Sequence, residues 1–183
     1  MKKYGKNLVG SFYQPNLVIS DINFLKTLPK REIICGYAEI LKHALIFDKK
    51  FFIFLEKNIS NILNLKSPLI EKTIFKSCKI KKFIVEKDEK ENNIRKILNF
   101  GHTFAHGYEA ALGYSKKLNH GEAVLLGMCS ALKFSYQNKF LKKNEFKSVL
   151  KHLENSNLNL DIKKIFSQKD LDKILLFMAK DKK

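Results

Sequence analysis

Apolar residues recur every three or four positions along most of this chain, the spacing of one face of an α-helix. The pattern is most strongly amphipathic at residues 51–65. It predicts helices over residues 32–47, 51–65, 68–85, 94–112, 122–140, 144–153 and 170–179. A charged connection at residues 86–93 and a loop at residues 113–119 separate three of them. The predicted fold class is therefore mainly α, a multi-helix bundle.

The first 27 residues follow a different pattern. Gly5, Gly10 and Pro15 interrupt any helical period, and residues 16–21 (NLVISD) have the composition of a short buried strand. This strand has no partner strand in its own sequence. The sequence thus predicts an N-terminal β segment and turn over residues 1–27, followed by a helical domain over residues 28–183.

Composition limits the possible classes of protein. A length of 183 residues and 45% hydrophobic content suit one domain with a real core. The chain has no apolar run long enough for a transmembrane helix or a signal peptide, so no membrane contact is expected. The cysteines are odd in number, far apart and lack a CxxC pair, which indicates buried thiols in a reducing cytoplasm; they are Cys35, Cys78 and Cys129.

The net charge of +17 raises the question of nucleic-acid binding. Only Arg31 and Arg95 of the 35 basic residues are arginine, although arginine dominates base and phosphate recognition. The lysines are spread over several predicted solvent faces and form no single stripe. We therefore expect no nucleic-acid partner, and a small anionic substrate explains a local part of the charge better.

Candidate chemistry is concentrated in residues 99–128, which hold three of the five histidines and five of the eight glycines. His102 and His106 are four apart and would project from one helical face, whereas His120 precedes the next predicted helix. Two imidazoles from separate helices and a carboxylate from elsewhere could form a three-ligand metal site with an open position. Each histidine taken singly could equally be a surface or core residue, and the spacing leaves both readings open.

Several blocks of the sequence resemble one family, in the family's order. They are GKNLVGSFYQP, LKTLPKRE, GYAEILKHALI, DEKENNIRKILNFGHTFAHGYE, NHGEAVLLGM and MAKDKK. Together they resemble the C-terminal, metal-binding domain of 3-dehydroquinate synthase, in the sugar-phosphate cyclase group. The resemblance spans nearly the whole chain, and the paired GHTFAH and HGEAV blocks are specific to that group.

The resemblance implies a set of site residues. A zinc or cobalt ion would be bound by Glu39, His102 and His120, which assigns His106 to the substrate. The implied contacts to a phosphorylated sugar-acid substrate are Asn7, Lys42, Lys81, Glu91, Arg95, Asn99, His106 and Lys182, of which Lys42, Lys81, Arg95, Asn99 and His106 would be catalytic. The implied NAD contacts are Lys6, Phe24, Leu25, Lys26 and Thr27. Glu91, Arg95, Asn99 and His102 would form a row on one helical face.

The implied reaction is the shikimate-pathway conversion of 3-deoxy-D-arabino-heptulosonate 7-phosphate into 3-dehydroquinate and phosphate. It is a carbon–oxygen lyase reaction with NAD as hydride carrier. Nothing in the chain resembles the glycine-rich NAD-binding loop of the family's N-terminal domain. We therefore expect the polypeptide to fold around a metal but not to turn over alone, with the N-terminal half missing from the sequence or separately encoded. Intact family members are commonly homodimers.

Three other hypotheses remain. The chain could belong to another sugar-phosphate cyclase, such as one similar to 2-deoxy-scyllo-inosose synthase, or to a related metal-dependent alcohol dehydrogenase. The third alternative is a non-catalytic basic helical module that binds a partner. Restoring the missing half and profiling substrates would separate the cyclases, and metal analysis would separate the module.

Overall fold

The computed structural model describes residues 13, 15–158 and 160–180. Its elements are η1 (Ile22–Thr27), α1 (Lys30–Phe47), α2 (Lys49–Leu63), α3 (Leu69–Lys87), η2 (Ile94–Asn99), α4 (His102–Ala111), α5 (His120–Gln137), α6 (Lys143–Asn155), α7 (Ile162–Ile165) and α8 (Gln168–Lys180), where η marks a 3-10 helix. The described residues form no strand. The predicted mainly α-helical bundle is thereby confirmed.

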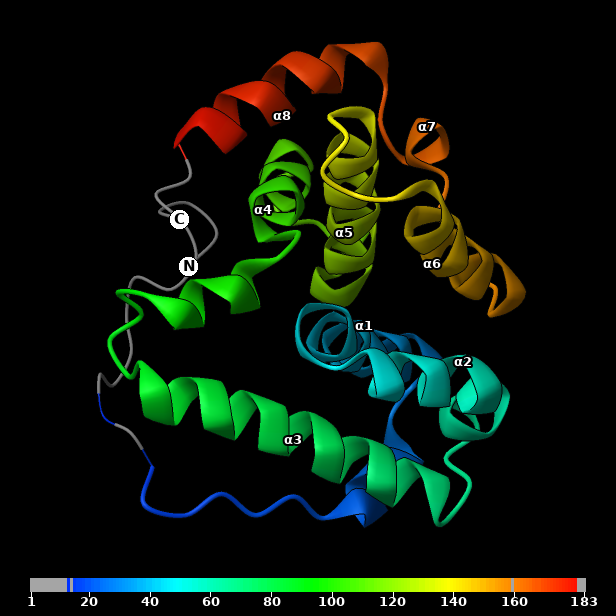
Figure 1. The fold of residues 1–183 in the computed structure, drawn as a ribbon. Coiled ribbons are helices and arrows are strands. Elements are labelled where there is room, and N and C mark those ends of the chain that lie inside the picture. Colours follow the sequence, from blue (N-terminus) through cyan, green and yellow to red (C-terminus); the bar gives the residue numbers. More distant parts are fainter. Residues whose placement is uncertain (1–12, 14, 159, 181–183) are drawn as a thin grey trace.

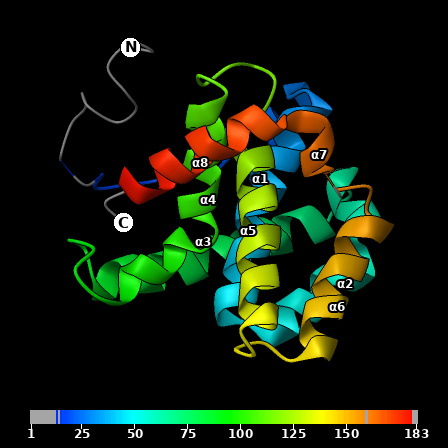
Figure 2. The same ribbon diagram turned by 90° about the horizontal axis from the view of Figure 1, so that it is seen from above.

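Helix α5 occupies the middle of the bundle (Figures 1 and 2). It packs against α4 on one side, against α1 below it in Figure 1, and against α6. Helix α8 lies across α4, while α2 and α3 pack on α1. The arrangement brings the N-terminal ends of α4 and α5 next to the middle of α1, where the candidate site lies.

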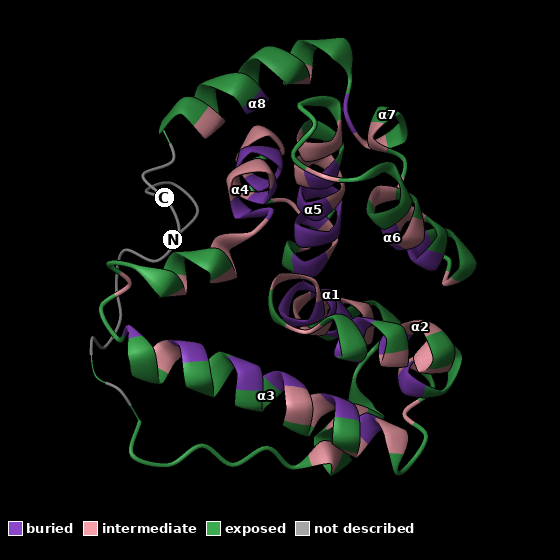
Figure 3. Ribbon diagram, viewed as in Figure 1, coloured by how far each residue is buried: buried purple, intermediate pink, exposed green. Residues whose placement is uncertain are grey.

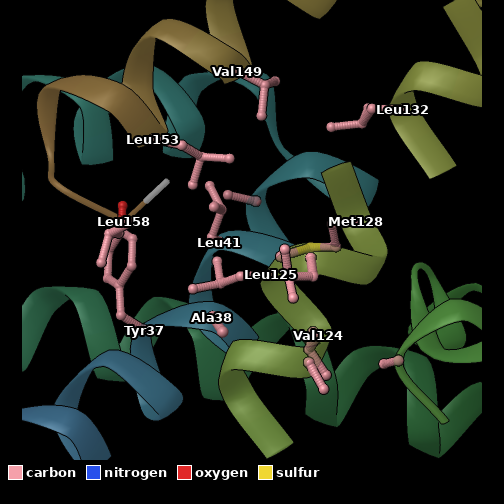
Figure 4. Packing of buried hydrophobic residues seen from close by; sticks show 14 of the residues in the cluster. Tyr37, Ala38, Leu41, Val124, Leu125, Met128, Leu132, Val149, Leu153 and Leu158 are labelled. Carbon is pink, nitrogen blue, oxygen red and sulfur yellow. The ribbon is translucent and has the colours of Figure 1, made fainter. Parts of the chain in front are cut away.

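The hydrophobic core takes residues from every helix from α1 to α6, and its part between α1, α5 and α6 lies at the centre of the bundle. Tyr37 and Leu41 of α1 meet Leu125 and Met128 of α5, with Leu153 of α6 closing the cluster (Figure 4). Buried residues are concentrated on α1, α4 and α5, whereas most of α8 is exposed (Figure 3). The three helices that carry the predicted metal ligands are therefore also those with the most burial.

Two glycines of α5 allow unusually close packing beside the site. A Cβ atom at Gly121 would lie 2.2 Å from Cα of Cys35 in α1. A Cβ atom at Gly127 would lie 2.1 Å from the carbonyl oxygen of Gly101, just before α4. Since real Cβ atoms cannot approach so closely, glycine at these positions sets the separation of α1, α4 and α5.

The predicted N-terminal strand is not formed among the described residues. Leu17, Val18 and Ile19 are 74%, 73% and 80% exposed. A strand requires a neighbour to accept and donate its ladder hydrogen bonds, and the described chain offers none. The prediction of a buried strand over residues 16–21 is wrong for the part of the chain that the structure describes.

The predicted continuous helix over residues 94–112 is also wrong. Residues 94–99 form the 3-10 helix η2, and α4 begins only at His102. Gly101 between them has φ +77°, a left-handed conformation that interrupts helical hydrogen bonding. A Cβ atom at this position would lie 2.7 Å from the backbone nitrogen of Met128, so the packing of α5 admits only glycine at the break.

No helix among the described residues is both long and apolar enough to cross a membrane.

Candidate metal and substrate site

The three predicted metal ligands meet at one point, although they are far apart in the sequence. Glu39 comes from α1, His102 from the first turn of α4 and His120 from the first turn of α5. Each offers one ligand atom, and these atoms all lie within 4.8 Å of one another. One carboxylate and two imidazoles are a donor set that suits Zn²⁺ or a similar divalent ion with an open coordination position.

The Glu39 carboxylate is divided between two neighbours. Oε2 accepts a hydrogen bond from the Lys42 ammonium at 2.7 Å, one turn along α1. Oε1 is buried without a hydrogen-bond partner among the described residues, and Nε2 of His102 lies 3.9 Å away. A buried carboxylate oxygen without a partner is costly. A cation between Glu39 and His102 would remove that cost, so the residues fit a bound metal.

Electrostatics keep this donor set in the form that binds metals. Burial opposes ionisation of Glu39, but the charge and hydrogen bond of Lys42 outweigh it and lower the pKa of the carboxyl group. Burial, helped by the Lys42 charge, lowers the pKa of His102 to about 4. At neutral pH, Glu39 is therefore a carboxylate and His102 a neutral imidazole.

The Nδ1 atom of His102 lies 3.3 Å from the carbonyl oxygen of Phe100. A carbonyl oxygen only accepts, so Nδ1 carries the proton and Nε2, which faces Glu39, has the lone pair. The ring is thus oriented by the backbone at the break before α4.

His120 is positioned by the start of α5. Asn119 caps the helix in a capping box with Glu122, each side chain bonding the backbone N–H of the other residue. Arg31 at the start of α1 donates to both carboxylate oxygens of Glu122 and to the carbonyl oxygens of Lys116 and Lys117. Burial opposes ionisation of Glu122, but the Arg31 hydrogen bond lowers its pKa. These hydrogen bonds of Arg31 connect the loop that precedes His120 to α1, the helix that contains Glu39.

A polar cavity of about 190 Å³ adjoins the ligand cluster. Its walls contain five of the predicted substrate residues together with two of the metal ligands; the full lining is Glu39, Lys42, His43, Lys81, Glu91, Arg95, Leu98, Asn99 and His102. Lys42, Lys81 and Arg95 outnumber the two carboxylates of this lining, Glu39 and Glu91, so the cavity would attract an anion. A larger groove of about 800 Å³ between α1, α2, α5 and α6 is mostly apolar and contains none of the three ligands.

The cavity wall from Asp88 to Asn99 is shaped by one carboxylate. Asp88 accepts hydrogen bonds from the backbone N–H groups of Asn92, Asn93 and Arg95, at 2.7–3.0 Å. Burial opposes ionisation of Asp88, but these bonds lower its pKa. Asn99 in turn donates to the carboxylate of Glu91. The four residues of the predicted row do line one cavity, but they come from a turn (Glu91), the 3-10 helix η2 (Arg95 and Asn99) and the start of α4 (His102).

The structure differs from the sequence-based prediction of the cavity lining at His106 and His43. His106 stacks edge-on against His102 with ring centroids 5.6 Å apart, and it does not line the described cavity. His43 does line it, with Nδ1 2.7 Å from Oγ of Ser77; its position beside Lys42 in the GYAEILKH block was the available signal. Asp88, which shapes the wall, begins the DEKENNIRK block of the family resemblance, but the sequence assigned it no role.

The remaining predicted contacts lie at the chain ends. Lys6, Asn7 and Lys182 are outside the described residues. Phe24, Leu25, Lys26 and Thr27 form the exposed 3-10 helix η1, with Phe24 73% exposed. This turn is the part of the predicted NAD site that the described residues contain.

Comparison with known proteins matches these elements to one family. The family described as 3-dehydroquinate synthase C-terminal matches residues 36–183, which include the whole ligand cluster. The chain belongs to this family. The family described as 3-dehydroquinate synthase N-terminal matches residues 2–35, so the two matches meet inside α1.

Relatives named 3-dehydroquinate synthase resemble the chain over nearly its full length. The protein from Pelagibacter ubique is 64% identical over 181 residues, covering 99% of this chain and 49% of the relative. The protein from Alkaliphilus metalliredigens is 44% identical, covering 98% of this chain and 49% of the relative. The chain therefore spans about half the length of the curated relatives it matches.

One solved structure shows the same fold. It is ValA, a 2-epi-5-epi-valiolone synthase from Streptomyces hygroscopicus subsp. jinggangensis, with NAD+ and Zn2+ bound. ValA is 25% identical in sequence to this chain, and the two structures match with a TM-score of 0.81. The match covers 95% of this chain and 47% of that chain.

Proposed function

We propose that this chain forms the metal- and substrate-binding part of a 3-dehydroquinate synthase. The enzyme would convert 3-deoxy-D-arabino-heptulosonate 7-phosphate into 3-dehydroquinate and phosphate in the cytoplasm. The observation that carries the proposal is the meeting of Glu39, His102 and His120 within 4.8 Å, beside a basic cavity. The 64% identity to the Pelagibacter ubique relative favours this activity over that of the 25% identical valiolone synthase.

The metal would be zinc or cobalt, held by Glu39, His102 and His120. When bound, it would act as a Lewis acid toward substrate hydroxyl and carbonyl oxygens. The ordered first turns of α4 and α5 would hold the two imidazoles, and the Lys42 hydrogen bond would fix the carboxylate. His106, one turn beyond His102, would contact the substrate from outside the coordination sphere.

The residues that line the cavity would bind the phosphate and the carboxylate of the substrate. Lys42, Lys81 and Arg95 carry the positive charges that a phosphate and a carboxylate require. The Asn99 amide and the Glu91 carboxylate, already joined by a hydrogen bond, would contact sugar hydroxyls. By holding the phosphate, these residues would also place it for departure.

The rest of the active site belongs to the other half of the family's length. NAD would supply the transient oxidation, and residues 24–27 would contact it from one side only. This other half could be joined to the same polypeptide or separately encoded, and the whole would form a homodimer. We expect no turnover from the 183-residue polypeptide alone, since the relatives it matches are about twice as long.

Metal content tests the ligand assignment. Zinc bound by the purified polypeptide should fall to background in Glu39→Ala, His102→Ala and His120→Ala. His106→Ala is a matched control, because it removes an imidazole from the same helix without removing a predicted ligand. Zinc content that stays unchanged in all three ligand variants would refute the metal site.

Activity is tested by a chimera. The N-terminal half of the Pelagibacter ubique relative, joined to this chain, should release phosphate from the heptulosonate phosphate when NAD and zinc are present. Product analysis should find 3-dehydroquinate. A chimera that is folded and zinc-loaded but forms 2-epi-5-epi-valiolone from a sugar phosphate, and no 3-dehydroquinate, would assign the chain to another cyclase.

A further inference from the structure

Glu109 is a buried acid in α4 that has no part in the proposed ligand set. It is only 6% exposed, and its Oε2 lies 3.3 Å from Nδ1 of His120 in α5. Keeping a carboxylate in such a position is unfavourable unless hydrogen bonds compensate. The contact joins the two helices that deliver the predicted histidine ligands.

The chemistry of this contact selects one form of the imidazole. When Glu109 is ionised, its carboxylate only accepts hydrogen bonds, so Nδ1 of His120 then carries the proton. In the neutral ring the lone pair is then on Nε2, across the ring from Glu109. A histidine ligand whose second nitrogen donates to a carboxylate is a recurrent arrangement at metal sites.

Packing restrains His120 less than it restrains His102. Its side chain is 44% exposed, whereas the side chain of His102 is 10% exposed and is already oriented by the Phe100 carbonyl. An exposed imidazole can rotate about its side-chain bonds and exchange tautomers. The Glu109 carboxylate therefore provides for His120 what burial and backbone provide for His102.

We propose that Glu109 is a positioning residue for the metal site, holding His120 as the Nδ1–H tautomer with Nε2 directed to the ion. This inference rests on the proposed metal site. It predicts that the hydrogen-bond acceptor at position 109 matters for metal affinity, and that the overall fold depends on it less.

Zinc affinity of the full chain, measured by competition with a chromophoric chelator, tests the role. Glu109→Leu should weaken zinc binding about 10- to 100-fold. Glu109→Gln should stay within about threefold of wild type, because its amide oxygen can still accept from Nδ1–H. Ser130→Ala is the matched control. It removes the 2.7 Å Tyr108–Ser130 hydrogen bond between the same two helices and should leave zinc affinity unchanged.

The tautomer itself is the second measurement. Long-range ¹H–¹⁵N correlation spectra of the metal-free chain at about pH 8, where imidazoles are neutral, report which ring nitrogen is protonated. His120, assigned by the signal lost in His120→Gln, should be protonated at Nδ1. In Glu109→Leu the signal should move to the Nε2–H form that predominates in water.

The outcomes separate the two proposals. A wild-type chain that binds no zinc would remove the metal site and this role together. Equal zinc affinities of wild type and folded Glu109→Leu would overturn only the role of Glu109. If Glu109→Leu does not fold, the wild-type spectrum decides, and an Nε2–H form of His120 would overturn the proposal.

Discussion

The two sides of the site are held in different ways. The ligand side (Glu39, His102 and His120) is carried by three helices that touch backbone to backbone at glycines. The cavity wall (residues 88–99) is a turn and a 3-10 helix, held mainly by backbone N–H groups that donate to the Asp88 carboxylate. Backbone packed against backbone resists displacement more than a turn held by a few hydrogen bonds does. The comparison predicts large, global effects on the ligand side and small, local effects on the wall.

The largest expected effect is from Gly127→Ala on the ligand side. The new Cβ would be 2.1 Å from the Gly101 carbonyl oxygen, a backbone atom that cannot move without shifting α4. We expect the free energy of unfolding to fall by about 3 kcal/mol. Gly36→Ala is the control, since a Cβ there meets nothing within 4 Å. It should stabilise the chain by about 0.5–1 kcal/mol. Equal urea midpoints for the two variants would contradict the rigidity of the ligand side.

A buried histidine extends the comparison into the core beneath the ligand side. Burial lowers the pKa of His152, which contacts Tyr37 of α1, to about 4. Between pH 6.5 and 4 the unfolded chain binds more protons at this residue than the folded chain. Its contribution to stability is therefore lost as the pH falls through that window.

The matching experiment compares wild type with His152→Gln in urea titrations with a chelator present. The wild-type free energy of unfolding should fall more steeply with decreasing pH, by about 1 kcal/mol per pH unit. Parallel pH dependences would show that His152 titrates normally in the folded state.

Asp88→Ala should act locally on the cavity wall. The variant leaves three backbone N–H groups without their acceptor. Amide exchange at Asn92, Asn93 and Arg95 should accelerate about tenfold or more, while amides of α4 and α5 keep wild-type rates. Asp161→Ala, which removes the cap of the distant α7, provides the control. Faster exchange in α4 as well would mean that the wall and the ligand side are one cooperative unit.

The smallest effect on stability is expected from Lys81→Ala. Lys81 is exposed at the cavity, and its loss should change the free energy of unfolding by less than about 0.5 kcal/mol. Binding of inorganic phosphate, measured by calorimetry, should nevertheless weaken. Lys82→Ala removes an equal charge from the neighbouring surface pair with Glu86 and should leave phosphate binding intact. If both variants lost phosphate affinity equally, the net charge of the chain, and not the cavity, would account for phosphate binding.

The helices and the residues of the candidate site could be predicted from the sequence to different extents. Apolar spacing predicted the helices, and the family resemblance predicted that Glu39, His102 and His120 would meet. The break at Gly101 was not predicted, because a single glycine in a helical pattern is compatible with continuation. The close approach of α5 to this glycine is a long-range contact that no local pattern reveals.

The hydrogen bonds that refine the site were less accessible still. Asp88 and Glu109 were part of charged or helical runs, where a solvent-facing acid is the ordinary expectation. Their roles depend on which backbone or imidazole groups the folded chain brings within reach. The strand prediction for residues 16–21 was wrong for a different reason. A strand needs a neighbouring strand to pair with, the described residues offer none, and the segment is exposed.

The left-handed turn at Gly101 has a consequence for how this pocket can change over evolution. The spacing between Asn99 and His102 is set by the main-chain conformation at Gly101, and the packing of α5 against Gly101 leaves no room for a side chain there. Exchanging side chains along residues 88–99 would therefore leave the spacing between Asn99 and His102 unchanged. A one-residue insertion or deletion at Gly101 would displace residues 88–99 relative to His102.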